Sequence, residues 1–383
     1  MQIQETRDSA WLPGLDGLRA IAVVLVIAFH LDTKQWVPGG FVGVDLFFVL
    51  SGFLITRLLL DEHDRRGRIE LIAFYLRRLR RLLPALVLTL TLVGVVSIGV
   101  LNEHSRNQPS LEIWTRSAFW SLGYGYNWLV AFDIPYMHSL VHVWSLSIEE
   151  QFYIVWPALI LISLHLGLER RQIRRMLIVL IGTSLALPLL YWDWIPFWHW
   201  GGDWRRMYYG SDYRAHALLA GCLLATLSSD ANWLARLPRR VLDRSAVVAA
   251  CTIGCVTATA TLDATWLYLG GFALVVLACA TIVLWATTTT SESAAMRVLE
   301  SVPMVWIGKR SYGLYLYHMP LVIWSRELQL TLADQVVLVS LTTLLITEAS
   351  YRWVERPIVE IGHAHTRESV PPSSPHASHA SHA

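Results

Sequence analysis

The chain has 383 residues, of which 54% are hydrophobic and only 16% are charged, and its formal net charge is +2. A soluble domain usually has about a quarter charged residues, so the composition excludes an ordinary soluble protein. The small net charge also argues against a nucleic-acid partner. Apolar runs of around twenty residues predict instead an all-α, polytopic membrane helical bundle.

The chain begins with a polar segment, 1–14, which we expect to be cytoplasmic and not a cleavable signal peptide. A transmembrane domain is expected over 15–360, and the Pro-, Ser- and His-rich segment 361–383 is expected to be a disordered cytoplasmic tail. The domain is predicted to contain ten spans, at about 15–33, 41–60, 82–101, 143–167, 175–194, 208–228, 245–263, 266–288, 302–325 and 331–351.

The arginines orient these spans, because positively charged loops stay on the cytoplasmic side. Three basic clusters lie within 61–81, 170–175 and 236–244. All three face the cytoplasm only if the apolar segment 111–131 does not cross the membrane. We therefore predict that 111–131 is re-entrant or interfacial, and that both termini are cytoplasmic.

The first span, LDGLRAIAVVLVIAFHL, carries two ionisable side chains, Arg19 and His30. They are eleven residues apart, close to three helical turns, and so share one face roughly 16 Å apart. Arg19 is either a helix-end anchor paired with Asp16 or a functional group. His30 lies deeper, where a neutral imidazole needs partners and can act as a base. We expect both to line a polar surface inside the bundle.

The second span begins FVGVDLFFVLSGFLIT and has Asp45 at its external end. A carboxylate there can orient His30 and stabilise its protonated form. A helix-end cap or a salt bridge to a surface cation explains Asp45 equally well. Ser51 and Gly52 are expected to permit close packing of helices.

The stretch FYLRRLRRLLPAL places four arginines before Pro84, at the mouth of the third span. Positive-inside topology and contact with anionic lipid explain any such cluster. The alternative is phosphate recognition, because the guanidinium fork matches phosphate oxygens. Arg78 and Arg81 are one turn apart on one face and could clamp a polyphosphate.

Two later spans add polar groups. The stretch WSLSIEEQFYIVWP places Glu149 and Glu150 near the external start of a span, where either can position a hydroxyl substrate or His30. The stretch SYGLYLYHMPL carries polar side chains that either line a substrate site or form hydrogen bonds between helices: Ser311, Tyr312, Tyr315 and His318.

The external loop 191–206 is dense in tryptophan, which indicates either an interfacial aromatic belt or a platform that stacks on a sugar or another acceptor ring. Cys251 and Cys255 share a helix face, but packing in the membrane explains them better than metal binding. No metal site is predicted.

Six blocks in this order resemble the bacterial acyltransferase-3 family of integral membrane O-acyltransferases over nearly the whole chain. The family's pattern of arginine, ten residues and histidine falls on Arg19 and His30, and its pattern of arginine, two residues and arginine falls on Arg78 and Arg81. The blocks are LDGLRAIAVVLVIAFH, GVDLFFVLSGFLIT, RRLRRLLPAL, WSLSIEEQFYIVWP, SYGLYLYHMP and YRWVERP.

The resemblance implies a multi-pass enzyme of the bacterial plasma membrane that transfers an acyl group, often acetyl, from acyl-CoA to a hydroxyl. Family acceptors include cell-surface polysaccharide, peptidoglycan or lipid-linked sugars, and antibiotics such as macrolides. Acyl-CoA is expected as donor substrate, with no permanently bound cofactor, and membrane lipid as surroundings. The oligomeric state is open, a homo-oligomer included. Many members carry a further extracytoplasmic domain, and this chain is expected to work without one or with a separate partner.

The expected mechanism places CoA at Arg78 and Arg81, with Arg19 near the entrance. The pantetheine arm, on the order of 15–20 Å, then reaches His30 three turns away. His30 takes the proton from the acceptor hydroxyl, or forms an acyl-histidine, and a carboxylate at 45, 149 or 150 supports it. A transporter or flippase of an acylated or lipid-linked sugar is the alternative function, and a lipid-binding scaffold is a third.

Overall fold

The computed structural model describes residues 12–31, 36–99, 110–191, 204–289, 293–328 and 330–360, and every regular element within these residues is a helix. Ten of the helices have 17 or more residues: α1 (Pro13–His30), α2 (Gly43–Arg66), α3 (Leu71–Val93), α6 (Val143–His165), α7 (Arg170–Tyr191), α9 (Ser211–Ser228), α11 (Arg239–Thr259), α12 (Phe272–Thr288), α15 (Ser311–Glu327) and α16 (Leu332–Ser350). The shorter elements are η1 (Gly40–Val42), η2 (Gly94–Ile98), α4 (Ser110–Leu122), α5 (Tyr126–Ala131), η3 (His138–Leu140), α8 (Trp204–Tyr209), α10 (Ala231–Ala235), η4 (Leu267–Gly271), α13 (Ala294–Leu299), α14 (Val302–Lys309) and η5 (Tyr351–Glu355).

Seven helical stretches of the described chain are long and apolar enough to cross a membrane. They are Pro13–His30, Gly40–Arg66, Leu71–Ile98, Val143–His165, Arg239–Thr259, Leu267–Thr288 and Leu332–Glu360. The three other predicted spans fall on α7, α9 and α15. The prediction of an all-α polytopic membrane protein is confirmed, and the number of ten spans stays a prediction. Residues 1–11 of the predicted segment 1–14, the whole of 361–383 and most of the Trp-rich loop 191–206 lie outside the described residues. The last residues of the first segment belong to α1, which begins at Pro13.

Two predicted spans differ in their ends from the helices that carry them. The third span was expected to begin near residue 82, but α3 begins at Leu71 and continues past Pro84. The arginine cluster is therefore part of the helix itself. The predicted span 302–325 is broken at Arg310, between α14 and α15. The guanidinium of Arg310 pairs with Glu348 of α16 and ties this break to the neighbouring helix.

The segment predicted to be re-entrant or interfacial folds as α4 and α5 with a turn between them. Helix α4 has 13 residues, about 20 Å, which is shorter than the ~30 Å hydrocarbon core. The turn is fastened to α6, because the side-chain amide of Gln151 donates to the carbonyl oxygen of Tyr124 (2.6 Å) and to Asn127 Oδ1 (2.9 Å). The depth of this pair of helices in the membrane stays a prediction.

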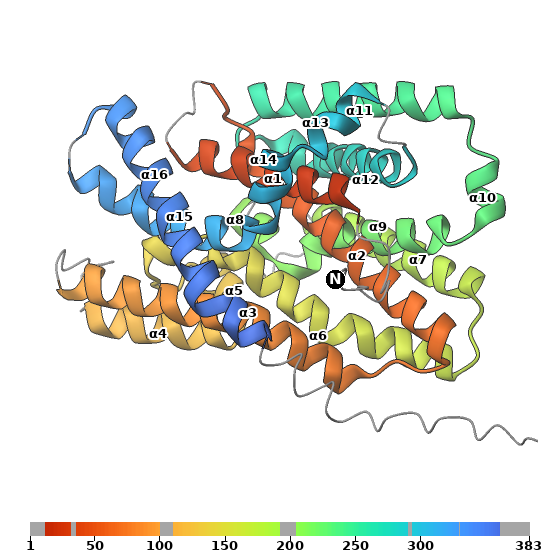
Figure 1. Ribbon diagram of the computed structural model, residues 1–383, viewed down its shortest axis with the longest axis horizontal. Coiled ribbons are helices and arrows are strands. Elements are labelled where there is room, and N and C mark those ends of the chain that lie inside the picture. The colour runs from red at the N-terminus through yellow and green to blue at the C-terminus, as the bar shows by residue number, and fades with distance from the viewer. Residues whose placement is uncertain are drawn as a thin grey trace, which may run out of the picture.

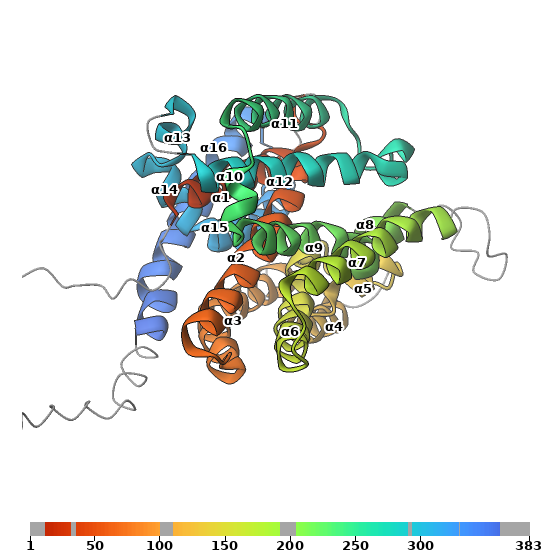
Figure 2. The ribbon, with the colours of Figure 1, turned by 90° about the vertical axis from the view of Figure 1, so that its right-hand side faces the viewer.

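The helices surround a central group formed by α1, α2, α9 and α12. Helix α11 lies along one edge of this group, and α3, α4 and α6 lie along the opposite edge (Figure 1). The view turned by 90° also places α11 and the pair of α3 and α6 on opposite sides (Figure 2). Helices α15 and α16 close one end (Figure 1).

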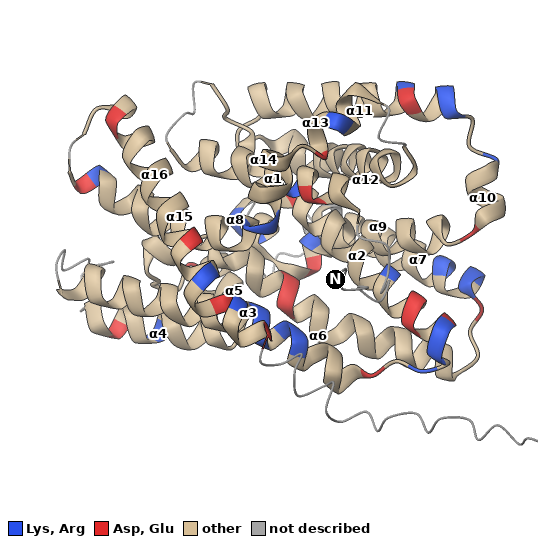
Figure 3. Ribbon diagram, in the orientation of Figure 1, with Lys and Arg blue, Asp and Glu red and all other residues tan. Residues whose placement is uncertain are grey.

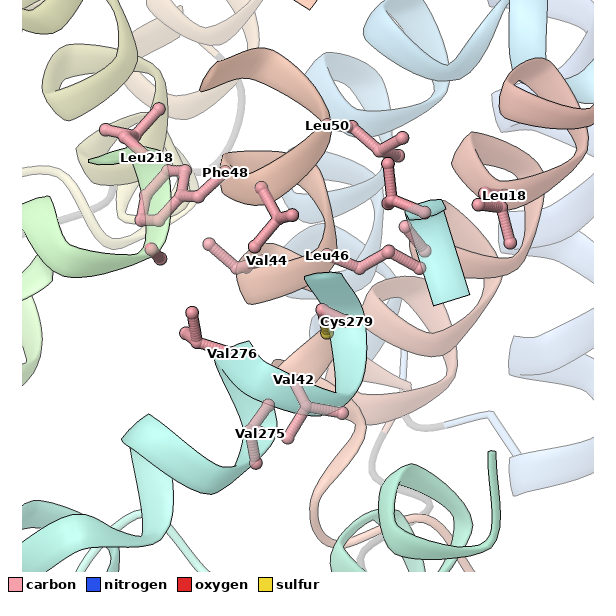
Figure 4. Close-up of a cluster of buried hydrophobic side chains, with 14 of the residues drawn as sticks. Leu18, Val42, Val44, Leu46, Phe48, Leu50, Leu218, Val275, Val276 and Cys279 are labelled. Carbon is pink, nitrogen blue, oxygen red and sulfur yellow. The ribbon is translucent and has the colours of Figure 1, made fainter. Parts of the chain in front are cut away.

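Helices α2 and α9 are in close backbone contact because each has a glycine at the crossing. A Cβ atom on Gly52 would lie 1.9 Å from the carbonyl oxygen of Leu218, and one on Gly221 would lie 2.1 Å from that of Val49. The expected packing role of Gly52 is confirmed, since only a residue without a side chain fits there. Apolar side chains from α1, α2, α9 and α12 form the core beside this crossing (Figure 4).

Candidate active site

Three cavities follow one another through the middle of the bundle. The arginine cavity, of about 330 Å³, is lined by Arg19, Arg78 and Arg81, together with Asp16 and Arg57. The central cavity, of about 90 Å³, shares the first three arginines with it. The histidine cavity, of about 30 Å³, contains His30 and His142 and shares Val44 and Tyr315 with the central cavity. Figure 3 shows basic and acidic residues on α3 and α6 near the middle of the view.

Helix α1 supplies both ends of this route. Arg19 lines the arginine and central cavities, and His30, at the last residue of the helix, lines the histidine cavity. Eleven residues of α-helix separate them by about 16 Å. Arg19 and His30 thus line different cavities of one series, and their shared polar surface stays a prediction.

The predicted clamp is only partly free to bind an anion. The Nε and Nη2 atoms of Arg78 both lie 2.9 Å from Glu150 Oε1, and its guanidinium stacks 3.2 Å over the ring centre of Tyr153. Arg81, one turn later, has no acidic partner within 4 Å among the described residues. Arg19 has a longer contact of 3.4 Å with Asp16. Arg81 is therefore the cation of this group with the most capacity for a new anion.

The two glutamates on α6 have separate partners. Glu149 lines the central cavity and accepts a 3.0 Å hydrogen bond from Ser51, whereas Glu150 pairs with Arg78. Neither described contact reaches His30. The expected support of His30 by Glu149 or Glu150 therefore rests on no described contact. Helix α6 instead places the two carboxylates next to Ser51 of α2 and Arg78 of α3.

Asp45 was expected to orient His30, but its described partner is Arg214 of α9. Asp45 Oδ1 lies 2.8 Å from Arg214 Nη2, and the two side chains are 0% and 1% exposed. The guanidinium also lies 4.3 Å from the ring centre of Phe272. Asp45 therefore belongs to a buried ion pair between α2 and α9. The expected support of His30 by Asp45 is wrong, because the carboxylate turns to Arg214 instead, and the alternative of a surface cation is wrong because Arg214 is buried.

The hydrogen-bond partner of the His30 ring is His318 of α15. The contacts of His318 show which ring nitrogen of each histidine carries the hydrogen. Nδ1 of His318 lies 2.6 Å from the carbonyl oxygen of Tyr315, and its Nε2 lies 3.1 Å from Nδ1 of His30. A carbonyl oxygen only accepts, so Nδ1 of His318 carries the hydrogen, and Nε2 of the neutral ring accepts. His30 therefore donates through Nδ1, and its own Nε2 keeps a lone pair that can take a proton.

His142 is a further histidine of the site that the sequence reasoning missed. Its ring packs 5.4 Å from that of His318, and its Nε2 lies 3.0 Å from the carbonyl oxygen of Leu316. Its Nδ1 is buried and has no hydrogen-bond partner among the described residues. The signal was a histidine two residues before the WSLSIEE block, next to the start of α6.

The polar group on α15 both lines the route and joins helices. Ser311, Tyr312 and Tyr315 line the central cavity. The hydroxyl of Tyr312 donates to the carbonyl oxygen of Leu82 at 2.7 Å, and that of Tyr315 lies 2.6 Å from Ser145 Oγ and 2.9 Å from the carbonyl oxygen of His142. His318 is not among the residues that line the three cavities and instead supports His30 from behind.

The arrangement as a whole places cationic side chains at one end of a narrow route and an imidazole with a free lone pair at the other. Guanidinium groups suit phosphate oxygens, and an imidazole whose second nitrogen is held by a hydrogen bond suits proton transfer. In the described residues, no group of three His, Cys, Asp or Glu side chains is placed to hold a metal ion.

Comparison with known proteins agrees with this arrangement. The chain is 34% identical to the peptidoglycan O-acetyltransferase OatA of Listeria monocytogenes and to the putative peptidoglycan O-acetyltransferase YrhL of Bacillus subtilis, in each case over 92% of this chain and 56% of the relative. It is 35% identical to the O-acetyltransferase OatA of Staphylococcus aureus, over 94% of this chain and 59% of that protein. The chain thus spans less than two thirds of the length of these relatives. No solved structure matches it.

A family model described as an acyltransferase domain matches residues 12–350, nearly the whole described chain. The resemblance seen in the six sequence blocks is therefore confirmed, and the chain belongs to the acyltransferase-3 family of membrane acyltransferases.

Proposed function

We propose that the protein is a membrane O-acetyltransferase that moves an acetyl or other short acyl group from acyl-CoA to the hydroxyl of a carbohydrate acceptor. The observation that carries the proposal is the series of cavities from the arginine group to His30. Its orientation follows the arginine distribution, with both termini on the cytoplasmic side of a bacterial plasma membrane and the arginine cavity facing cytosolic CoA.

The size of the route favours a thin donor arm and a small acyl group. The central and histidine cavities have volumes of about 90 and 30 Å³. Since one water needs roughly 10–15 Å³ of such space, the histidine cavity holds about two or three small atoms, which matches an acetyl group and not a long chain. The ~16 Å between Arg19 and His30 matches an extended pantetheine arm of about 15–20 Å.

The CoA phosphates contact Arg81 first, and Arg78 contributes where Glu150 releases it. The thioester lies at the histidine cavity, where His30 Nε2 takes the proton of the acceptor hydroxyl. The hydroxyl oxygen then bonds to the thioester carbonyl carbon, the C–S bond breaks, and the CoA thiolate leaves with the electron pair and takes up the proton. In the relay variant, His30 Nε2 first bonds to the carbonyl carbon while the C–S bond breaks and the CoA thiolate leaves with the electron pair. The acceptor oxygen then bonds to the same carbon, the C–N bond to His30 breaks, and the hydroxyl proton passes to the thiolate.

We assign a carbohydrate as the acceptor because the reaction needs a hydroxyl group and because of the names of the relatives. Two of the relatives are named for peptidoglycan, a carbohydrate polymer rich in hydroxyl groups. Glycolipids and hydroxyl-bearing antibiotics share the reacting group and form the comparison set for the assay. The flippase alternative requires no acyl transfer, so a single chemical readout separates the two functions.

The test uses purified protein in proteoliposomes with radiolabelled acetyl-CoA and a panel of cell-wall glycan fragments, glycolipids and macrolides. We expect transfer of label to an acceptor hydroxyl, and loss of at least about 100-fold in rate for His30→Ala with acetyl-CoA binding retained. Turnover of His30→Ala at the wild-type rate would refute the assigned role. Absence of transfer to every acceptor, together with movement of a lipid-linked sugar across the bilayer, would favour the flippase.

A further inference from the structure

A second cavity, separate from the route above, lies between α1, α11, α12 and α13. It has a volume of about 730 Å³ and an almost wholly apolar lining. One face of α11 forms its longest wall, with Ala246, Val247, Ala250, Ile253 and Gly254 one turn after another. We refer to it as the α11 groove.

The α11 groove has one closed end. The backbone N–H of Gly39 donates to the carbonyl oxygen of Thr257 at 2.8 Å, and a Cβ atom on Gly39 would lie 2.1 Å from the carbonyl oxygen of Val256. The lining extends from Thr257 back to Asp243, fourteen residues or about 21 Å of helix. This length exceeds one leaflet of the ~30 Å hydrocarbon core, so the groove suits an extended hydrocarbon chain.

The other end of the groove is polar and basic. Asp243 accepts a 3.0 Å hydrogen bond from Trp285 Nε1 and pairs with Arg239 at 3.3 Å. Arg240 lies three residues before Asp243, on the same face of α11 that lines the groove. It is exposed and has no acidic partner among the described residues. An apolar groove that ends beside an unpaired arginine matches a molecule with a hydrocarbon tail and an anionic head.

The groove does not open into the reaction route, because α1 separates them. Leu18, Ile21 and Leu25 of α1 line the groove, while Arg19 and His30 on the same helix line the three cavities of the route. A molecule in the groove therefore packs against the back of the helix that carries Arg19 and His30 and is not positioned as the acyl acceptor.

We propose that the α11 groove binds one anionic membrane phospholipid, with an acyl chain along α11 and the phosphate beside Arg240. The hydrocarbon fills the apolar volume, and the phosphate supplies the anion that the exposed guanidinium lacks. The lipid completes the packing behind α1. This proposal concerns a binding site and holds whichever acceptor the reaction uses.

Gly254 offers a direct way to fill the groove. A Cβ atom at Gly254 meets no atom within 4 Å, and the same is true of Gly182 on α7, which does not line the groove. Gly254→Phe therefore occupies the groove without a backbone clash, and Gly182→Phe is the matched control. Arg240→Gln removes the cation, with Arg171→Gln of α7 as its control.

The experiment is native mass spectrometry of the purified full chain titrated with phosphatidylglycerol or with phosphatidylcholine of identical chains. Wild type should retain one phosphatidylglycerol more tightly than phosphatidylcholine. Gly254→Phe should lose this lipid, and Arg240→Gln should weaken phosphatidylglycerol about fivefold while leaving phosphatidylcholine unchanged, the effect of one arginine near an anionic lipid. The Gly182→Phe and Arg171→Gln controls should behave as wild type.

Equal retention by wild type and a folded Gly254→Phe variant would overturn the site, with thermal stability confirming folding. Equal affinity for the two lipids in wild type would overturn the anionic headgroup. Because lipid retention is measured without turnover, failure here leaves the proposed acyl transfer intact, and failure of acyl transfer leaves the lipid site intact.

Discussion

Replacement of His318 tests whether this residue acts through His30. Asn and Gln are matched probes, since the Asn amide reaches about as far as the histidine Nδ1, and the Gln amide about as far as Nε2. His318→Asn keeps a donor for the Tyr315 carbonyl but removes the acceptor that faces His30. His318→Gln restores an acceptor near that position. We therefore expect His318→Gln to retain more activity than His318→Asn.

The magnitude follows from one hydrogen bond. During transfer His30 becomes protonated, and its Nδ1–H donates to His318 as a charge-assisted bond, which is worth about 1.5–3 kcal/mol. At about 1.36 kcal/mol per factor of ten, His318→Asn should lower kcat by roughly 10- to 150-fold. The buried environment, with His318 0% exposed, prevents water from replacing the acceptor easily.

The assay is label transfer from acetyl-CoA in proteoliposomes, with kcat and KM measured separately. His30→Ala combined with His318→Asn should be no slower than His30→Ala alone, because a positioning residue has no effect once the base is absent. Multiplication of the two losses in the double variant, or equal rates for the Asn and Gln variants, would refute the reasoning.

Three further predictions concern other parts of the structure. Arg81→Gln should raise the Kd for acyl-CoA about 10- to 100-fold by loss of a charged phosphate contact, measured by equilibrium binding, while Arg77→Gln outside the cavities changes it little. Asp45→Asn should lower the free energy of unfolding in mixed micelles by about 3–5 kcal/mol, because it leaves Arg214 as a buried unpaired charge, and an unchanged stability would contradict the buried ion pair. Gly52→Ala should destabilise the fold by about 1–3 kcal/mol through the clash with Leu218, and a neutral result in the same measurement would show that α2 and α9 separate at little cost.

The sequence was sufficient for features that depend on local pattern. Hydrophobic runs predicted the helices, and helical periodicity placed Arg19 and His30 on one face. The glycine at 52 marked a close crossing for the same reason, since a small residue in an apolar helix has few other uses.

Pairs between distant helices could not be predicted in this way. His30 and His318 are 288 residues apart, Asp45 and Arg214 are 169 apart, and each pairing depends on how whole helices pack. The sequence alone does not distinguish His30 from a cation on another helix as the partner of Asp45. The same long-range packing pairs Glu150 with Arg78 and leaves Arg81 without an acidic partner among the described residues.

The central claim is that a cytosolic donor reaches His30 from the arginine side of the membrane. Its most direct test uses inverted membrane vesicles with labelled acetyl-CoA outside and a hydroxyl acceptor enclosed. Wild type should acetylate the enclosed acceptor, and His30→Ala should bind acetyl-CoA normally but transfer label at least about 100-fold more slowly. Transfer by His30→Ala at the wild-type rate, or transfer only when donor and acceptor share one side, would contradict the account.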